Sequence, residues 1–269
     1  MAVNKNLRGT LSYSSITLLI LAVIMFPVPP RFTDFVILLN IVLSVLVLID
    51  VQLRKKDNDY SVFSNYLLYM TIFGLAVNVM VTRQIISLGE HFNSILIRFI
   101  ADPLSGSGSE LITAILIIFV ACVVFVFFKY VYKIYSISKT SAVSNLENRH
   151  KKIMAVDSEY NVRSITEEEA DKRKMNIQEN VDFFETLSES AEFFVNCEKF
   201  RFLLILINAV GGITIGTRFK GDSFTEAFQY YISLTAASGF LALIPVFFLA
   251  FSARIVLLQK LKSQGKLTL

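Results

Sequence analysis

The chain has few of the side chains on which common enzyme classes depend. It contains no tryptophan, only two histidines and only two cysteines among 269 residues. Cys122 lies in an apolar run and Cys197 in a charged segment, which is not a metal-binding spacing, and His91 and His150 stand alone. The sequence has no phosphate-binding glycine loop followed by lysine, no His-Glu-x-x-His motif and no Ser/His/Asp set. We therefore predict no enzymatic activity, no metal and no cofactor.

A continuous block of positive charge is also missing. The formal net charge is +4, and the basic residues between positions 135 and 199 are interleaved with about as many acidic ones. A nucleic-acid-binding face needs a basic patch, so we expect no nucleic-acid partner.

Apolar sequence is what the chain has in excess. It is 54% hydrophobic, with a mean hydropathy of +0.58, and its apolar runs are long and continuous rather than alternating. The expected fold class is all-α: a polytopic helical membrane protein with about six transmembrane helices. A small helical cytoplasmic segment is expected between the fourth and fifth helices.

The apolar runs place the expected spans at 15–29, 35–52, 62–82, 111–128, 200–217 and 226–258. They divide the chain into a four-helix region, a charged cytoplasmic segment and a two-helix region with a short tail, at 1–134, 135–199 and 200–269. Thr33 and Asp34 are suited to cap the second helix, and residues 84–100 suggest an interfacial helix. Because lysine and arginine stay in the cytoplasm, their distribution predicts that both termini are cytoplasmic.

Titratable residues gather in the charged segment and at its border with the fifth span. The main ones are Lys152, Asp157, Glu159 and Glu198. Desolvation and neighbouring charges can shift the pKa values of such groups toward neutral pH, which suits a proton relay. The same residues suit plain salt bridges, which the sequence alone favours. Thr166 and Glu169 match a capping box, and four phenylalanines form a sparse apolar side expected to lie on the membrane or on a neighbour: Phe183, Phe184, Phe193 and Phe194.

The third span carries polar residues where a lipid-facing helix would carry leucines. In one interpretation Arg83 reaches the membrane surface and Asn78 bonds a neighbouring helix; in the other they serve function, and spacing alone weighs both equally. Elsewhere, the pair Gly211–Gly212 permits close helix approach. Pro245 is expected to kink the sixth span and free a carbonyl that needs another partner.

Several of these stretches together resemble the export-gate family of bacterial flagella and type III secretion systems, also called the FHIPEP family. The first two spans resemble its Leu-Pro-x-Pro…Asp…Asn-Ile-x-Leu-Ser pattern through Pro27, Pro29, Asp34, Asn40, Ile41, Leu43 and Ser44. Residues 73–83 resemble its most specific signature, Phe-Arg-Leu-Ala-Leu-Asn-Val-x-Ser-Thr-Arg, and include Asn78, Thr82 and Arg83. Residues 154–159 resemble Met-Ala-Ile-Asp-Ala-Asp, and Asn208, Gly211, Gly212, Gly239 and Pro245 follow in the family's order.

The resemblance implies an inner-membrane subunit that assembles as a ring around an export channel and couples the proton-motive force to the export of unfolded proteins. It implies membrane lipid, other export-apparatus membrane proteins and exported proteins as partners, with a homo-oligomeric ring or a ring shared with a paralogue. The family's coupling residues fall on Lys152, Asp157 and Glu198, and the arginine that ends the span-3 signature falls on Arg83.

The chain also departs from the family pattern. The early arginine of the span-3 signature is Gly74 here, and the serine before Thr-Arg is Val81. The Pro-Gly before the loop lysine is replaced at 150–151, and the Gly-Asp-Gly of the sixth span is replaced at 237–239, so that an intramembrane acid is missing. Family members usually continue with two more spans and a large cytoplasmic docking domain. Because this sequence ends at Leu269, it is read as a truncated or diverged paralogue or as a fragment of a longer protein.

The leading hypothesis is an export-gate subunit in which Asp157 and Lys152 take part in proton-coupled gating, so that Asp157→Ala abolishes export at normal membrane levels. The competing hypothesis is a structural or regulatory subunit that joins a ring of full-length paralogues without coupling. A third, ranked last, is an unrelated small transporter or channel, because no set of intramembrane charges of substrate size is evident.

Overall fold

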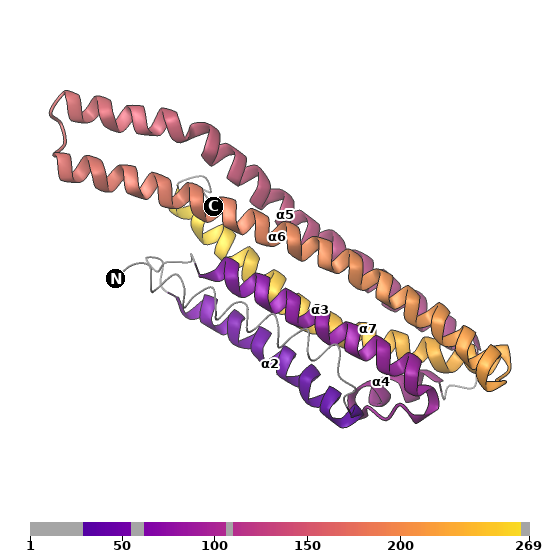
Figure 1. Cartoon of the computed structure of the whole chain (residues 1–269). Coiled ribbons are helices and arrows are strands. Elements are labelled where there is room, and N and C mark those ends of the chain that lie inside the picture. The colour runs from indigo at the N-terminus through magenta and orange to yellow at the C-terminus, as the bar shows by residue number, and fades with distance from the viewer. Residues whose placement is uncertain (1–28, 55–61, 106–109, 265–269) are drawn as a thin grey trace.

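Every described element of the computed structural model is a helix. The structure describes residues 29–54, 62–105 and 110–264. In chain order the helices are α2 (Pro30–Leu53), α3 (Phe63–Leu88), η1 (Gly89–His91), α4 (Ile95–Ser105), α5 (Glu110–Asn161), α6 (Glu167–Ile215), η2 (Gly216–Lys220) and α7 (Phe224–Ser263). The expected all-α class is therefore confirmed. Figure 1 shows the long helices lying side by side, with the short α4 across one end.

Helix α2 begins earlier than the sequence predicts. It starts at Pro30, with the extended Pro29 as its N-cap residue. Proline suits the first helical position because its missing N–H would have no partner within the helix. The expectation that Thr33 and Asp34 cap this helix is therefore wrong. Both lie inside it, and their side chains bond other parts of the chain.

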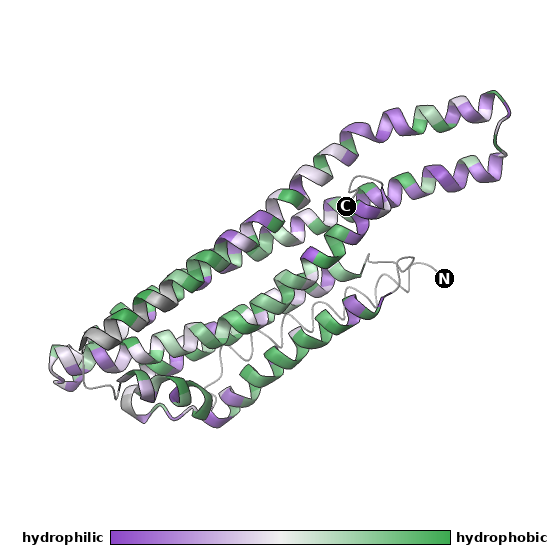
Figure 2. Cartoon of the chain, turned by 180° about the vertical axis from the view of Figure 1, so that it is seen from behind, coloured by the Kyte–Doolittle hydropathy of each residue, from purple (hydrophilic) through white to green (hydrophobic). Residues whose placement is uncertain are grey.

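The charged segment and the spans on either side of it form two long helices. Helix α5 has 52 residues and α6 has 49, and they run without a break through positions 134–135 and 199–200. Together they make an antiparallel hairpin that projects beyond the other helices (Figure 1). Figure 2 shows that the projecting tip is mainly hydrophilic, whereas the part that packs on the other helices is mainly hydrophobic.

Two apolar clusters hold the bundle together, one toward each end. The cluster on the hairpin side joins Val51 at the end of α2, Phe63 at the start of α3 and Leu257 near the end of α7. It also includes Phe183, Phe184 and Phe194, which confirms that these phenylalanines pack on neighbouring helices, whereas Phe193 is exposed. The cluster at the opposite end surrounds Tyr231.

Within the described residues, four helical segments are long and apolar enough to cross a membrane: α2, α3, α6 together with η2, and α7. The expected first span lies outside the described residues. The expected fourth span forms the beginning of α5, where part of the chain is not described in side-chain detail. The count of six therefore stays a prediction. The exposed face of α2 is lined with apolar side chains that suit lipid: Phe35, Leu38, Val42, Leu46, Ile49 and Leu53.

The expected interfacial helix at 84–100 is wrong in its bounds. Its first residues complete α3, and a separate helix, α4, begins at Ile95. The chain turns between them at Gly89, whose φ of 51° is a left-handed conformation that favours glycine. Helix α7 then starts with a capping box, in which Ser223 and Glu226 bond each other's backbone N–H groups.

Candidate functional site: an ion pair buried between the helices

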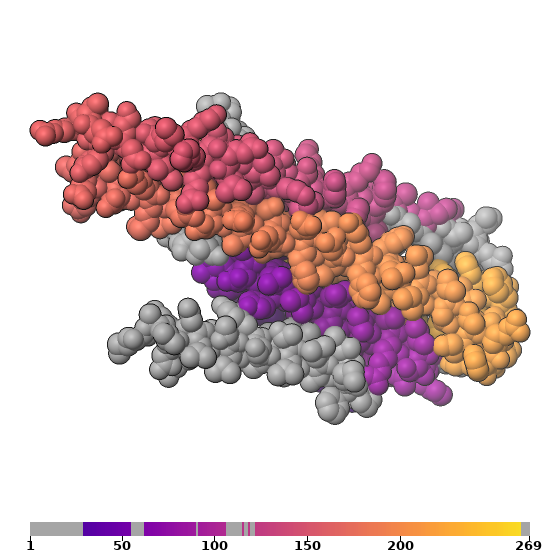
Figure 3. All heavy atoms as spheres, turned by 45° about the horizontal axis from the view of Figure 1, so that its top comes forward, coloured from indigo at the N-terminus to yellow at the C-terminus, as the bar shows by residue number. Residues whose placement is uncertain are grey.

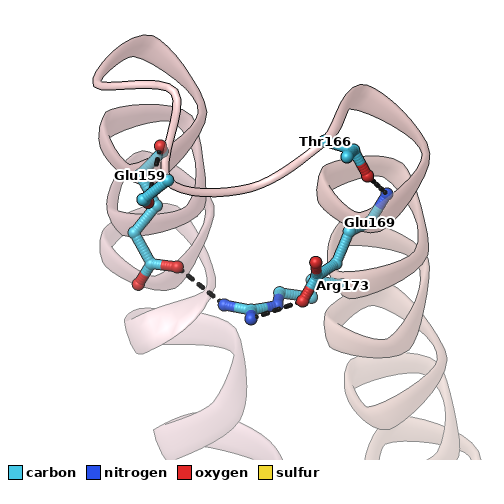
Figure 4. A network of polar contacts seen from close by, with 5 residues as sticks. Glu159, Thr166, Glu169 and Arg173 are labelled. Carbon is cyan, nitrogen blue, oxygen red and sulfur yellow. Dashed lines mark hydrogen bonds and ion pairs between the residues drawn. The ribbon is translucent and has the colours of Figure 1, made fainter.

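Charged residues at the hairpin tip form exposed ion pairs. Lys174 Nζ on α6 lies 2.5 Å from Asp157 Oδ1 on α5. Arg173 bonds Glu159 across the hairpin at 2.6 Å and Glu169 on its own helix at 2.7 Å, as Figure 4 shows. The hydrogen bond with Asp157 raises the pKa of the Lys174 ammonium above its ordinary value, so Lys174 stays charged at neutral pH. These are the plain salt bridges that the sequence favours.

The hairpin tip does not bring the predicted coupling residues together. Lys152 is exposed and lies five residues before Asp157 on α5, so the two side chains leave the helix about 140° apart. Glu198 follows Lys174 by 24 residues on the same helix, which corresponds to about 36 Å. The candidates Lys152 and Asp157 therefore lie far from the candidate Glu198.

The expected capping box at the start of α6 forms only in part. Thr166 Oγ1 accepts a hydrogen bond from the Glu169 backbone N–H at 3.3 Å. The Glu169 carboxylate, however, bonds Arg173 (Figure 4). The arginine therefore links the helix start to α5 in place of the second bond of the box.

Polar residues of the third span have different roles. Asn78 Nδ2 donates to the Gly74 carbonyl of its own helix at 3.0 Å, so the expectation that Asn78 bonds a neighbouring helix is wrong. The bond between helices is made by Thr82, whose Oγ1 accepts from Asn208 Nδ2 on α6 at 3.2 Å, with both residues buried. Arg83 is exposed near the end of α3, as expected for a residue that reaches the membrane surface.

Asp34 fixes the position of α4 from a neighbouring helix. Its buried carboxylate accepts from the hydroxyl of Ser94 and from the backbone N–H groups of Ile95 and Leu96. A carboxylate at these unpaired N–H groups stabilises the start of a helix. One residue earlier on α2, Thr33 donates to Gln84 on α3 at 2.8 Å. These two residues therefore fasten α2 to α3 and α4.

The two neighbouring glycines of α6 are not equivalent. A Cβ atom at Gly212 would lie 2.3 Å from Cδ1 of the Tyr231 ring, whereas one at Gly211 would make an ordinary 3.5 Å contact with Ile86. Close approach of α6 and α7 therefore depends on Gly212. Around Pro245, the Ala242 carbonyl accepts from Arg201 Nη1 at 3.0 Å. Proline frees the carbonyl four residues before it, which is that of Leu241 rather than Ala242, so the expected outside partner for that carbonyl stays a prediction.

Glu198 and Arg201 form a buried ion pair on one face of α6. Glu198 is 8% exposed and Arg201 is 5% exposed, and Glu198 Oε1 lies 3.4 Å from Arg201 Nη2. Among the described residues, Glu198 Oε1 and Arg201 Nε have no hydrogen-bond partner. Burial of an ion pair is costly unless its remaining donors and acceptors are satisfied, so this arrangement is a candidate for function rather than for stability alone.

The pair lies at mid-depth in the bundle. The guanidinium of Arg201 packs beside Gly74, which is 11 residues after the start of α3 and 14 before its end, or about 16 and 21 Å. The sequence places Glu198 just before a span, but α6 is continuous, and its pair with Arg201 faces the middles of α3 and α7. Figure 3 shows α6, in orange, lying between α5 and the purple α3.

A cavity of about 330 Å³ reaches the ion pair from the space between α5, α6 and α7. Its lining is mainly apolar and includes Phe128, Phe202 and Leu243, with Glu198 and Arg201 among the few charged residues. A carboxyl in such a place has two chemical states: an ionised form paired with arginine, and a protonated form that releases it. Arg201 also bonds the Ala242 carbonyl of α7 and lies beside Gly74 of α3, so the residues of this site come from three helices.

Sequence reasoning misses Arg201. It stands at the first residues of the predicted fifth span, where an arginine at the membrane surface is unremarkable. The available signal is its spacing of three from Glu198, which places both side chains on one helix face. A metal site is not indicated, because the described residues include no group of three or more His, Cys, Asp or Glu side chains able to hold an ion.

Apolar helices that enclose an ion pair at mid-depth define a polytopic membrane protein with a polar site in its interior. The chain belongs to the FHIPEP family, whose model matches residues 20–268. It is 31% identical to a flagellar biosynthesis protein FlhA of Borreliella burgdorferi over 97% of this chain and 37% of that protein. It is 32% identical to a flagellar biosynthesis protein FlhA of Treponema pallidum over 82% of this chain and 32% of that protein. It is 28% identical to the Salmonella typhimurium protein of the same name over 93% of this chain and 37% of that protein.

The chain thus spans about a third of the length of these curated relatives. No solved structure matches it. Family membership confirms the resemblance that the motifs along the chain carry.

Proposed function

We propose that the chain is an inner-membrane subunit of a flagellar or type III protein-export gate, and that Glu198 and Arg201 form its proton-responsive site. Family membership and the names of the relatives support the export apparatus. The observation that carries the site is the buried carboxyl of Glu198 beside Arg201 at mid-depth in the bundle. Ionisable residues at such depth are usually functional.

The proposed mechanism follows from the contacts of Arg201. With Glu198 ionised, the guanidinium is held between the carboxylate, the Ala242 carbonyl and the backbone at Gly74. When Glu198 takes up a proton, the ionic attraction is lost while the bond to α7 remains. The face of α6 that meets α3 and α7 then repacks, and the long hairpin carries this movement to its hydrophilic tip.

We further propose a multi-pass arrangement with both termini in the cytoplasm. Lysines in the last turn of α7 and the hydrophilic hairpin tip suit the cytoplasmic side of a bacterial inner membrane. The partners are then membrane lipid, other export-apparatus membrane proteins, exported proteins, and either further copies of this chain or a longer family member. Lys152 and Asp157 at the hairpin tip remain candidates for contact with these proteins during coupling.

Substitutions at Glu198 test this function in a strain that depends on the chain for export. Glu198→Gln keeps the size of the side chain but cannot ionise, and Glu198→Asp keeps the acid. Because the glutamine variant leaves Arg201 without its carboxylate, export is compared at equal membrane level; we expect the glutamine variant then not to export and the aspartate variant to export. Export by the glutamine variant at the wild-type rate would show that no proton is exchanged at this residue.

One observation favours a second candidate function, a non-coupling structural subunit. Ser238 stands where the family pattern has an intramembrane aspartate, and its hydroxyl donates to the Thr235 carbonyl of its own helix. A hydroxyl bonded in this way cannot replace an acid in proton exchange. Purification from its own host distinguishes the two: recovery only together with a longer family member, and normal export by Glu198→Gln, support the structural subunit.

A further inference from the structure

The backbone of α3 is open where the guanidinium of Arg201 meets it. A Cβ atom at Gly74 would lie 3.3 Å from Arg201 Nη2 and 3.4 Å from Asn40 Nδ2. The first distance is tight for a side-chain contact, so the guanidinium already fills the place that a side chain at position 74 would take. Glycine lets the charged group of α6 lie directly against α3.

Arg201 is the only lysine or arginine that is fully buried in the part of the chain that the structure describes. Its charge comes from α6, whereas the span-3 signature carries an arginine at the position of Gly74. An arginine at position 74 would place its charge in the same region as Arg201, because position 74 faces both the Arg201 guanidinium and Asn40. We propose that Arg201 supplies from α6 the buried positive charge that the signature supplies from α3, and that Gly74 is a positioning residue that admits it.

Electrostatics and packing both require that only one of the two positions holds an arginine. Two guanidinium groups beside a single carboxylate leave one buried charge unpaired, which is strongly unfavourable. A second long side chain also overpacks a site whose neighbouring cavity between α2, α3 and α7 holds only about 20 Å³. With neither arginine, Glu198 loses the one ion-pair partner that it has among the described residues.

Asn40 gives an arginine on α3 a second partner. Its side chain is 5% exposed, and Oδ1 has no hydrogen-bond partner among the described residues. That oxygen lies 3.9 Å from the Cβ position of residue 74. An arginine side chain at position 74 of α3 would therefore lie beside the Asn40 oxygen as an acceptor. It could also reach the space left empty when Arg201 is replaced by a smaller residue.

The test is a double-mutant cycle on the thermal unfolding of the full chain in detergent. We expect Arg201→Ala and Gly74→Arg each to lower the Tm, the first by removing the cation and the second by adding a competing one. The double variant Gly74→Arg/Arg201→Ala is expected to recover most of the lost Tm, because it again holds one arginine. The control Gly74→Leu/Arg201→Ala fills the same space without charge and is expected to stay low.

A double variant no more stable than Arg201→Ala, or a leucine control that recovers equally well, would overturn the charge relocation. If the single variants fail to accumulate, the membrane yields of the two double variants are compared instead. A higher yield of Gly74→Arg/Arg201→Ala than of Gly74→Leu/Arg201→Ala supports the charge relocation, and equal yields overturn it. The charge relocation is tested by the Tm values alone, and export is measured separately because it tests the proposed function. Recovery of Tm without recovery of export would leave the charge relocation intact and refute the role of the pair in coupling.

Discussion

Two regions of this protein pair acids with bases in opposite surroundings. At the hairpin tip, Asp157 and Lys174 meet at 2.5 Å with side chains 46% and 36% exposed. In the bundle, Glu198 and Arg201 meet at 3.4 Å with side chains 8% and 6% exposed. The closer pair is surrounded by water, which screens it and offers other partners to both groups. The Glu198–Arg201 pair, although its atoms lie farther apart, is buried and so does not have water as an alternative partner.

The contrast shows that distance alone does not rank ion pairs. An exposed pair contributes little to stability and is easily replaced. A buried pair contributes little net stability either, but the loss of one partner leaves the other without compensation. The bundle pair is therefore the place where a single proton has the larger consequence for packing.

The largest effect is expected from the removal of the buried cation. Arg201→Met retains much of the apolar volume but leaves Glu198 unpaired, so we expect a loss of about 3–5 kcal/mol in the free energy of unfolding. Unfolding of the purified chain in detergent measures it. The matched control is Arg201→Met/Glu198→Gln, which removes both charges and is expected to recover most of the loss. If the single variant were as stable as the double one, the two regions would not differ as described.

Gly212→Ala is expected to have the next largest effect. The added methyl group would lie 2.3 Å from the Tyr231 ring, so α6 and α7 must separate, at a cost of about 1–3 kcal/mol. The adjacent Gly211→Ala variant is the control, because its methyl group meets only Ile86 at an ordinary distance. Equal Tm values for the two variants would contradict the close approach of α6 and α7.

A smaller loss is expected from Thr82→Val in the bundle. The substitution preserves shape but removes the acceptor of the Asn208 amide, which costs about 1 kcal/mol in a buried position. Asn208→Leu/Thr82→Val then removes both polar groups, and we expect it to regain stability relative to the single variant. A Tm unchanged by Thr82→Val would indicate that this bond does not contribute to the contact between α3 and α6.

The sequence predicts the helical membrane class, the family and most spans, because long apolar runs and ordered motifs determine them. It does not predict that α5 and α6 run unbroken from the membrane to the hairpin tip, since the change from apolar to charged composition has no local stop signal. Nor does it predict the partners of Asp34, which bonds residues 60–62 positions away. Arg201 is missed for the same reason: its depth depends on α3 and α7, which no local pattern of α6 contains.

The smallest effect on stability is expected at the hairpin tip. We expect Asp157→Ala to leave the Tm unchanged within error, because Lys174 remains in water when its partner is removed. The pKa of Lys174 is raised by this pair, so any contribution is present below the ordinary lysine pKa and is lost as the pH rises through the raised value. Export near neutral pH is therefore not controlled by titration of Lys174.

Measuring export by the Asp157→Ala variant shows whether Asp157 at the hairpin tip has a function apart from any effect on stability. If Asp157 takes part in coupling, as proposed, Asp157→Ala abolishes export at a normal membrane level and a normal Tm. Lys174→Ala breaks the same ion pair from the other side and is the matched control, for which we expect export to continue. Equal export by both variants and the wild type would assign Asp157 and Lys174 to a plain salt bridge and would contradict a role for Asp157 in coupling.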